Sequence, residues 1–180
     1  MFQQEIKIPK DRLAVLIGKK GEIKRHLERQ LNLKVFINSN TGEINLSGED
    51  NLNIYICKNI IHAIGRGFNP DIALLLLDDE YCFEQINLEE YARGRKNRLL
   101  TLRSRLIGTQ GVFRKTLEDM TDCYVVIYGK TVCIIGRIEN IFLAKRAIEN
   151  LLRGSPHGKV YKSVERLKKK NKKDDRNKSS

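Results

Sequence analysis

The chain has 180 residues and a formal net charge of +12, with 41% hydrophobic and 31% charged side chains. This composition is ordinary for a soluble globular protein that buries one core or two small ones. The longest apolar run, Ile72 to Leu77, is too short to span a bilayer, and no apolar segment follows Met1, so we expect a cytoplasmic protein without membrane contact.

Residues 1–67 carry the hydrophobic periodicities of a unit with the order β-α-α-β-β-α. Short alternating segments predict strands, and apolar residues at spacings of three and four predict helices. The expected elements are a strand at residues 5–8, a short helix capped by Asp11 and ended by Gly18, a helix from Gly21, strands at 34–37 and 43–46, and a long helix with its apolar stripe on Leu52, Ile56, Ile60, Ala63 and Ile64.

Residues 68–80 form a connector that is too apolar for a solvated linker. Asn69-Pro70-Asp71 is a helix-start pattern, and a short helix is expected to run from it through Leu77. The connector is therefore predicted to be packed rather than flexible.

Residues 81–154 repeat the first unit. A shift of ninety residues places Leu16-Ile17-Gly18 on Leu106-Ile107-Gly108, and after two short gaps Arg66-Gly67 falls on Arg153-Gly154. The same elements are expected, although the first strand lies about ten residues further from the glycines than in the first copy. That extra stretch is basic and holds Arg93, Arg95, Lys96 and Arg98.

Residues 155–180 form a basic C-terminal tail. From Arg153 onward the chain has eleven Lys and Arg against three acids, so this part holds eight of the twelve net positive charges. A docked helical turn or two is expected on Val160, Tyr161, Val164 and Leu167. Beyond Lys168 we expect disorder. Such a tail attracts phosphate backbones, although solubilisation or binding to an acidic membrane fits the charge alone equally well.

Each unit contains a Gly-x-x-Gly loop between two helices, at Gly18–Gly21 and Gly108–Gly111. Glycine lets the backbone turn sharply and approach a ligand without an intervening Cβ. The second glycine also begins a helix, whose free N–H groups and positive dipole end suit a phosphodiester. A lone Gly-x-x-Gly is usually only a turn, but two in the same context favour a groove for about four unpaired nucleotides.

The two loops differ in charge. Lys19 and Lys20 are expected to face phosphate, whereas Thr109 and Gln110 leave the second loop to rely on backbone amides and nearby arginines. A second unit kept only for packing is the alternative. The candidate RNA-binding residues are the loops, their flanking bases and an apolar groove floor: Ile17, Gly18, Lys19, Lys20, Gly21, Lys24, Arg25, Val35, Ile37, Arg103, Arg105, Ile107, Gly108, Thr109, Gln110, Gly111, Arg114, Lys115, Val125 and Ile127.

On these residues the chain resembles the type I KH fold across residues 2–153. The expected fold class is α+β, with two type I KH domains, each a β-α-α-β-β-α unit in which a three-stranded antiparallel sheet packs on three helices. More narrowly, the chain resembles archaeal members of the partner-of-NOB-one family, also called Dim-two, and in part the related Krr-type factors. The segments that carry this resemblance are Arg105–Gly111, Thr121–Val126, Thr131–Gly136 and Arg153–Tyr161.

The resemblance implies an assembly factor that binds the 3′ end region of small-subunit ribosomal RNA within the precursor subunit. It also implies a partnership with the PIN-domain endonuclease that trims this end. The uncharged second loop departs from the family, in which many members carry basic residues there. Two fused units with a packed connector favour a monomer.

Three other function classes compete with RNA binding. An enzyme is disfavoured because the chain lacks the GxxxxGK[ST] pattern and any nucleophile triad. The four cysteines form no CxxC pair and the histidines lack ligand spacing, so we expect no cofactor and no metal. The acidic run 78–80 would suit a metal-dependent nuclease, but a solvated turn that ends a helix is the preferred interpretation. A single-stranded DNA-binding regulator and an RNA-associated protein scaffold stay open.

Overall fold

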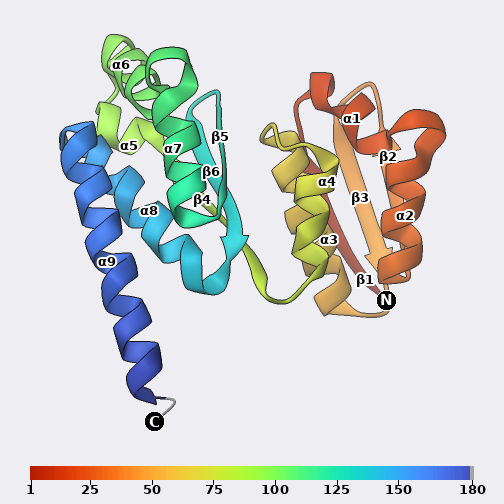
Figure 1. The fold of residues 1–180 in the computed structure, drawn as a ribbon. Helices are drawn as coiled ribbons and strands as arrows, with labels where there is room; N and C mark the ends of the chain where they lie inside the picture. The colour runs from red at the N-terminus through yellow and green to blue at the C-terminus, as the bar shows by residue number, and fades with distance from the viewer. Residues whose placement is uncertain (179–180) are drawn as a thin grey trace. The chain divides into compact units, whose positions relative to one another are not determined.

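The computed structural model describes residues 1–178, with side chains as far as residue 174. The chain divides into two units (Figure 1), unit 1 at Met1–Phe83 and unit 2 from Glu84 onward. Each unit contains a three-stranded antiparallel sheet packed with helices. The predicted α+β class and the internal repeat are therefore confirmed.

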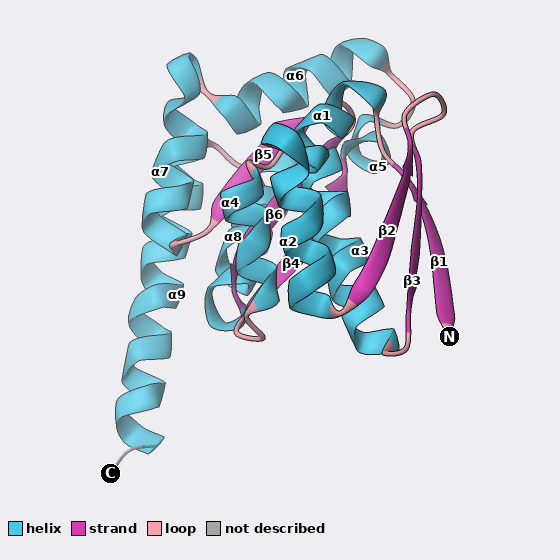
Figure 2. Ribbon diagram, turned by 90° about the vertical axis from the view of Figure 1, so that its right-hand side faces the viewer, coloured by secondary structure: helices cyan, strands magenta, loops and turns pink. Residues whose placement is uncertain are grey.

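Unit 1 has the predicted element order, and its sheet has the strand order β1-β3-β2. Its elements are β1 (Phe2–Lys7), η1 (Lys10–Arg12), α1 (Leu13–Ile17), η2 (Lys19–Gly21), α2 (Glu22–Leu31), β2 (Leu33–Asn38), β3 (Glu43–Gly48) and α3 (Asn51–Gly65). The register places Ile6 opposite Ile44 and Val35 opposite Leu46, and all four side chains are buried. Because alternate strand residues point to one face, this face forms the core against α1, α2 and α3 (Figure 2).

Two local details of unit 1 differ from the prediction. Asp11 does not cap α1, because it lies inside the 3-10 turn η1 and Arg12 occupies the cap position. Leu52, expected to begin the apolar stripe of α3, is 63% exposed. Ile60, Ala63 and Ile64 of the predicted stripe are buried as expected, and Ile54, Cys57 and Ile61 complete the buried side of α3.

The connector forms the predicted short helix, as α4 (Pro70–Ala73) followed by the 3-10 turn η3 (Leu74–Leu77). The Asn69 side chain caps α4 by accepting the Asp71 N–H at 3.0 Å. Both short elements pack against α3. The connector therefore belongs to the core of unit 1.

Unit 2 repeats the architecture with the strand order β4-β6-β5. Its elements are β4 (Tyr81–Asn87), whose first three residues belong to unit 1, α5 (Leu88–Ala92), α6 (Lys96–Ile107), η4 (Thr109–Gly111), α7 (Val112–Thr121), β5 (Tyr124–Tyr128), β6 (Thr131–Arg137) and α8 (Ile138–Leu152). The extra length before the glycines is accounted for by α5 and by a turn at Arg93 and Gly94, both with positive φ. Arg93 and Arg95 of the basic stretch lie in the segment between α5 and α6, and Lys96 and Arg98 lie in the first turn of α6.

The C-terminal tail is helical over a longer range than predicted. Helix α9 (His157–Lys178) docks on unit 2 through Val160 and Val164, which are 1% and 2% exposed. Disorder beyond Lys168 is not observed over residues 169–178. Lysine is a good helix former, and the Lys168 ammonium is itself anchored to the Met120 carbonyl at 2.8 Å. Residues 179–180 lie outside the described residues.

No helix within residues 1–178 combines the length and the apolar character that a membrane span requires. The four cysteines form no disulfide with one another, and all but Cys82 are buried. Burial, with a smaller contribution from the charge of Glu28, raises the pKa of the Cys57 thiol to about 12. In the described part of the chain, no three His, Cys, Asp or Glu side chains gather in a group that could hold a metal ion.

Candidate nucleic-acid interface

The two Gly-x-x-Gly loops, loop 1 (Gly18–Gly21) and loop 2 (Gly108–Gly111), share one backbone conformation. The first glycines have φ of 74° and 75°, and the second glycines have φ of 76° and 74°. Between them Lys20 and Gln110 both take a left-handed φ of 53°, which non-glycine residues rarely adopt. Since the inner residues differ, the fold rather than the loop sequence sets this geometry.

The glycines in each loop have separate roles. A Cβ on Gly18 would lie 2.5 Å from Ile23 Cγ1, and one on Gly108 would lie 2.7 Å from Phe113 N. The first glycine therefore allows the two helices to approach each other. A Cβ on Gly111 would meet nothing within 4 Å, and one on Gly21 would meet only the Arg25 guanidinium, so the second glycine leaves the backbone accessible to a ligand in loop 2 and beside a cation in loop 1.

The charge around the loops is unequal, as predicted. In unit 1, Lys19 and Lys20 are exposed, and Arg25 Nη1 lies 3.4 Å from the position of a Cβ on Gly21. In unit 2, Thr109 and Gln110 are exposed but neutral. Loop 1 thus presents three cations where a phosphate would lie, and loop 2 presents none within the loop itself.

One flanking basic residue on the helix after each loop forms an ion pair. Lys24 contacts Glu28 at 3.1 Å, and Arg114 contacts Glu118 at 3.2 Å. Lys115 is exposed. Lys24 and Arg114 therefore bring less net charge to the grooves than the sequence alone suggested, because a carboxylate partly neutralises each.

The same glutamates join helix to strand in both units. Glu28 Oε1 accepts the Val35 N–H at 2.9 Å, and Glu118 Oε1 accepts the Val125 N–H at 2.7 Å. These bonds fix the strand edge beside each loop. The ninety-residue shift aligns the two glutamates. It does not predict their hydrogen bonds to strand residues seven positions further along the chain.

The apolar floor contains only part of the predicted set. Ile17, Ile37 and Ile127 are half-buried, and Ile107 is 37% exposed. These four side chains remain accessible to a base.

The prediction that Val35 and Val125 contact bases is not supported by their positions. Their side chains are 1% and 2% exposed. They lie at core-facing positions of β2 and β5, where the helices cover them. Val35 and Val125 therefore contribute to the packing of β2 and β5 on the core and not to the RNA-facing surface.

Arg105 has a structural role in unit 2. Its Nη1 donates to the Leu151 carbonyl at 2.9 Å and its Nη2 donates to the Ser155 carbonyl at 2.7 Å. Leu151 lies in the last turn of α8, where helix carbonyls lack the usual internal partners, and Ser155 lies in the loop that follows this helix. The predicted phosphate contact of Arg105 is therefore not supported, because its guanidinium is committed to this clamp.

Unit 1 contains the equivalent clamp from a different sequence position. Arg12 Nε donates to the Ile64 carbonyl at 2.8 Å and its Nη2 donates to the Phe68 carbonyl at 2.9 Å. A shift of 87 residues places these two carbonyls on those of Leu151 and Ser155. Sequence reasoning missed Arg12. The available signal was the helix end at Arg66-Gly67, whose carbonyls need donors.

Arg103 lies one helical turn before Ile107 on the same side of α6. Its Nε is buried and has no hydrogen-bond partner among the described residues. A buried N–H without an acceptor costs about 1–3 kcal/mol. Because the Arg103 Nε is buried, this unsatisfied donor is not accessible to RNA in the structure.

The acidic run after η3 forms a turn. The Asp78 carboxylate accepts the Glu80 N–H at 2.9 Å, and the Asp78 carbonyl accepts the Tyr81 N–H at 3.1 Å. The preferred interpretation of residues 78–80 as a turn that ends a helix is confirmed.

Two protein-family models match this chain. A KH-domain model matches residues 3–63, and a model described as a eukaryotic type KH domain of type I matches residues 82–169. Each match contains one of the two loops.

Individual relatives cover nearly the whole chain. A KH domain-containing protein of Methanocaldococcus jannaschii is 44% identical over 169 residues, which are 92% of this chain and 74% of that protein. The RNA-binding protein pno1 of Dictyostelium discoideum is 30% identical over 88% of this chain and 68% of its own length. The crystal structure of the a/eIF2alpha–aDim2p–rRNA complex from Pyrococcus horikoshii OT3 contains a chain that is 45% identical, with a TM-score of 0.84 over 94% of this chain and 95% of that one.

Proposed function

Because the chain belongs to the KH-domain family of the pno1 and Dim2p proteins, we propose that it is an RNA-binding assembly factor of the small ribosomal subunit. The observation that carries the proposal is the pair of loops with one backbone conformation, each ending in a glycine with positive φ at the start of a helix. Such a loop accepts a phosphodiester while the strand beside it contacts unstacked bases.

The bound RNA in this proposal is a single strand from the 3′ end region of the small-subunit ribosomal RNA. Support comes from the rRNA complex of the Pyrococcus relative and from the pno1 relative, which is described as RNA-binding. Loop 1 grips phosphate through Lys19 and Lys20. In unit 2 the neutral loop offers its backbone amides, and the exposed Lys115 on the following helix adds a positive charge.

The protein partner in this proposal is the PIN-domain endonuclease that trims the same RNA end. We place this chain in the cytoplasm as a monomer that positions the RNA and does not cleave it. Incubation with Mg²⁺ and labelled RNA tests the last point, since cleavage by the pure protein would contradict it.

Crosslinking followed by sequencing of the attached RNA tests the main proposal. We expect crosslinks concentrated at the 3′ end of the small-subunit RNA, and we expect loop peptides on the protein side. A competition between RNA and DNA strands of the same sequence completes the test. Crosslinks spread over unrelated RNAs, or a clear preference for DNA, would contradict the proposal.

A further inference from the structure

Helix α9 has two long sides with different surroundings. One side packs on unit 2, with Val160 and Val164 buried and Tyr161 stacked on Phe113 at a ring distance of 5.5 Å. The other side carries exposed basic residues, among them Lys159, Lys162, Arg166, Lys169 and Lys170. Because one side of α9 is packed, its basic side lies at a defined place on unit 2.

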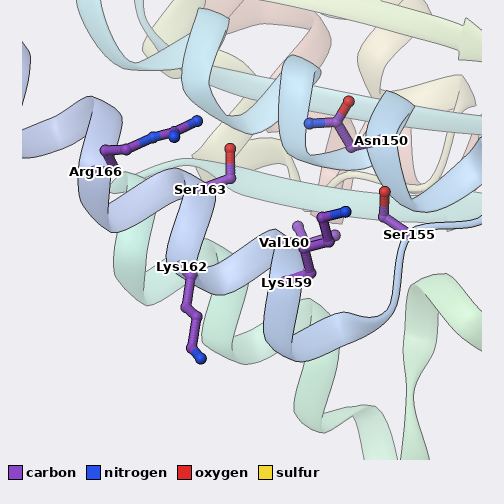
Figure 3. A pocket seen from close by; sticks show the side chains of 7 residues that line it. All are labelled: Asn150, Ser155, Lys159, Val160, Lys162, Ser163 and Arg166. Carbon is purple, nitrogen blue, oxygen red and sulfur yellow. The ribbon is translucent and has the colours of Figure 1, made fainter.

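A cleft of about 390 Å³ lies where this basic side meets the end of α8. Val160 is its apolar lining residue. The polar lining residues are Asn150, Ser155, Lys159, Lys162, Ser163 and Arg166. In Figure 3 the side chains of Arg166, Ser163 and Asn150 lie along the seam between the two helices, whereas the Lys162 side chain extends away from it.

The cations of the cleft are not neutralised by the protein. Within residues 1–174, no ion pair involves Lys159, Lys162 or Arg166. By contrast, Lys168 on the same helix contacts Asp122 at 3.4 Å, and Lys145 on α8 contacts Glu84 at 2.9 Å. The cleft thus concentrates positive charge that an anion would balance.

The chemistry of the lining fits a phosphate diester. Arginine and lysine bind phosphate oxygens through charge-assisted hydrogen bonds, and hydroxyl and amide groups add donors without charge. Glu149 and Glu165 are close in sequence, but neither carboxylate lines the cleft. A carboxylate there would repel an anion.

The start of α9 lies beside loop 2. Phe113, the second residue after the loop, stacks on His157 at 4.5 Å, and His157 Nε2 lies 2.9 Å from the Arg105 carbonyl. The beginning of α9 is therefore close to loop 2 in the fold of unit 2.

We propose that the cleft between α8 and α9 binds a backbone phosphate of the RNA, as a contact separate from both Gly-x-x-Gly loops. This inference rests on the proposed RNA-binding function. It gives the basic tail a defined site, and it assigns Arg166 and Lys159 as the phosphate-binding residues.

The test compares RNA lengths in the full chain. A strand of about four nucleotides fills one KH groove, whereas a strand several times longer also reaches the cleft. The double variant Arg166→Gln with Lys159→Gln should weaken the long strand about tenfold and lower its salt slope by about 0.7 to 1.4. The affinity for the short strand should not change.

A matched control removes two charges from the same helix outside the cleft. Lys169→Gln with Lys170→Gln should change the affinity for the long strand less than about twofold, because exposed charges away from the bound phosphate are screened. Equal losses in the two double variants would overturn the inference. The inference would also be overturned if the cleft variant lost affinity equally for the short and the long strand. The same holds if the cleft variant lost binding to vesicles of anionic lipid but kept its affinity for the long RNA strand. If the unaltered protein binds neither strand, the proposed function itself fails.

Discussion

The two units build the same loop geometry with different chemistry. Loop 1 and loop 2 agree in φ at both glycines and at the third residue to within a few degrees, yet one contains two lysines and the other threonine and glutamine. The glutamate bridge to the neighbouring strand also occurs in both. The comparison shows that the fold supplies the shape of the groove, and that charge within the loop varies independently of it.

The clamps at the end of the last helix show the same separation. Arg12 lies in the turn before α1, and Arg105 lies in the last turn of α6, yet both donate to equivalent carbonyls. The structural requirement is a pair of donors at a helix end, and two different sequence positions meet it. Equivalent function in a repeat therefore does not require aligned residues.

The largest expected effect tests whether loop charge determines affinity. Lys19→Asp with Lys20→Asp should weaken binding of single-stranded RNA about 100-fold, because two attractive charges beside a phosphate become repulsive. Aspartate tolerates the left-handed conformation at position 20, so the fold should persist. Titration at several salt concentrations measures both the affinity and the reduced salt slope.

The matched variant in unit 2 is Thr109→Asp with Gln110→Asp. We expect a smaller loss, about tenfold, because it adds repulsion without removing attraction. If the two variants lose affinity equally, loop 2 binds phosphate as strongly as loop 1. An unchanged affinity in the unit 1 variant would remove loop 1 from the interface.

The next effect concerns the clamps. Arg105→Ala and Arg12→Ala should each lower the free energy of unfolding by about 2 kcal/mol, since two carbonyls lose charged donors. Chemical denaturation measures this loss. The RNA affinity of the folded Arg105→Ala variant should stay within about twofold of the unaltered protein, because its guanidinium does not face the groove.

Arg105→Lys separates the structural role from an RNA contact. Lysine keeps the charge but cannot donate to both carbonyls with the same fixed geometry, so stability should remain low. If lysine restores a lost RNA affinity, then Arg105 contacts phosphate after all.

Placing the two lysines of loop 1 in loop 2 should increase RNA affinity, by a smaller factor than the losses expected above. Thr109→Lys with Gln110→Lys should raise RNA affinity about fivefold and increase the salt slope by about 0.7 to 1.4. The shared backbone conformation is the reason to expect a gain, because the new lysines would occupy the positions of Lys19 and Lys20. No gain at low salt would mean that RNA does not pass loop 2.

The sequence predicted the fold and the loops well because both depend on local patterns. The two glycines, the strand alternation and the repeat at a ninety-residue shift all lie within short stretches. The sequence could not show which basic side chains are available to RNA and which are engaged in contacts within the protein. Arg105 and Arg12 donate to carbonyls about fifty residues away, so only the folded chain distinguishes them from Lys19. The burial of Val35 likewise depends on helices distant in sequence.

The smallest expected effect concerns the cores of the two units. It is a contribution of Cys57 to the pH dependence of stability, and this contribution is absent at neutral pH. Cys57 of α3 is buried in unit 1, and the same 87-residue shift places Ala144 of α8 in unit 2. Burial raises the pKa of the folded Cys57 thiol from 9.0 to about 12. Below pH 9.0 the thiol is protonated in both the folded and the unfolded chain, so this group adds no pH dependence there.

Between pH 9.0 and about 12 the unfolded chain ionises Cys57 and the folded chain does not, so stability falls as pH rises. The contribution is about 1.4 kcal/mol per pH unit in that window. Cys57→Ala, which copies unit 2, should flatten this part of the stability curve even though the smaller side chain lowers stability at neutral pH. Urea denaturation of both proteins at about pH 8 and about pH 10.5 isolates the difference, because every other titrating group is shared. Parallel curves would show that the thiol can ionise in the folded unit, and that the core around α3 opens more readily than its burial indicates.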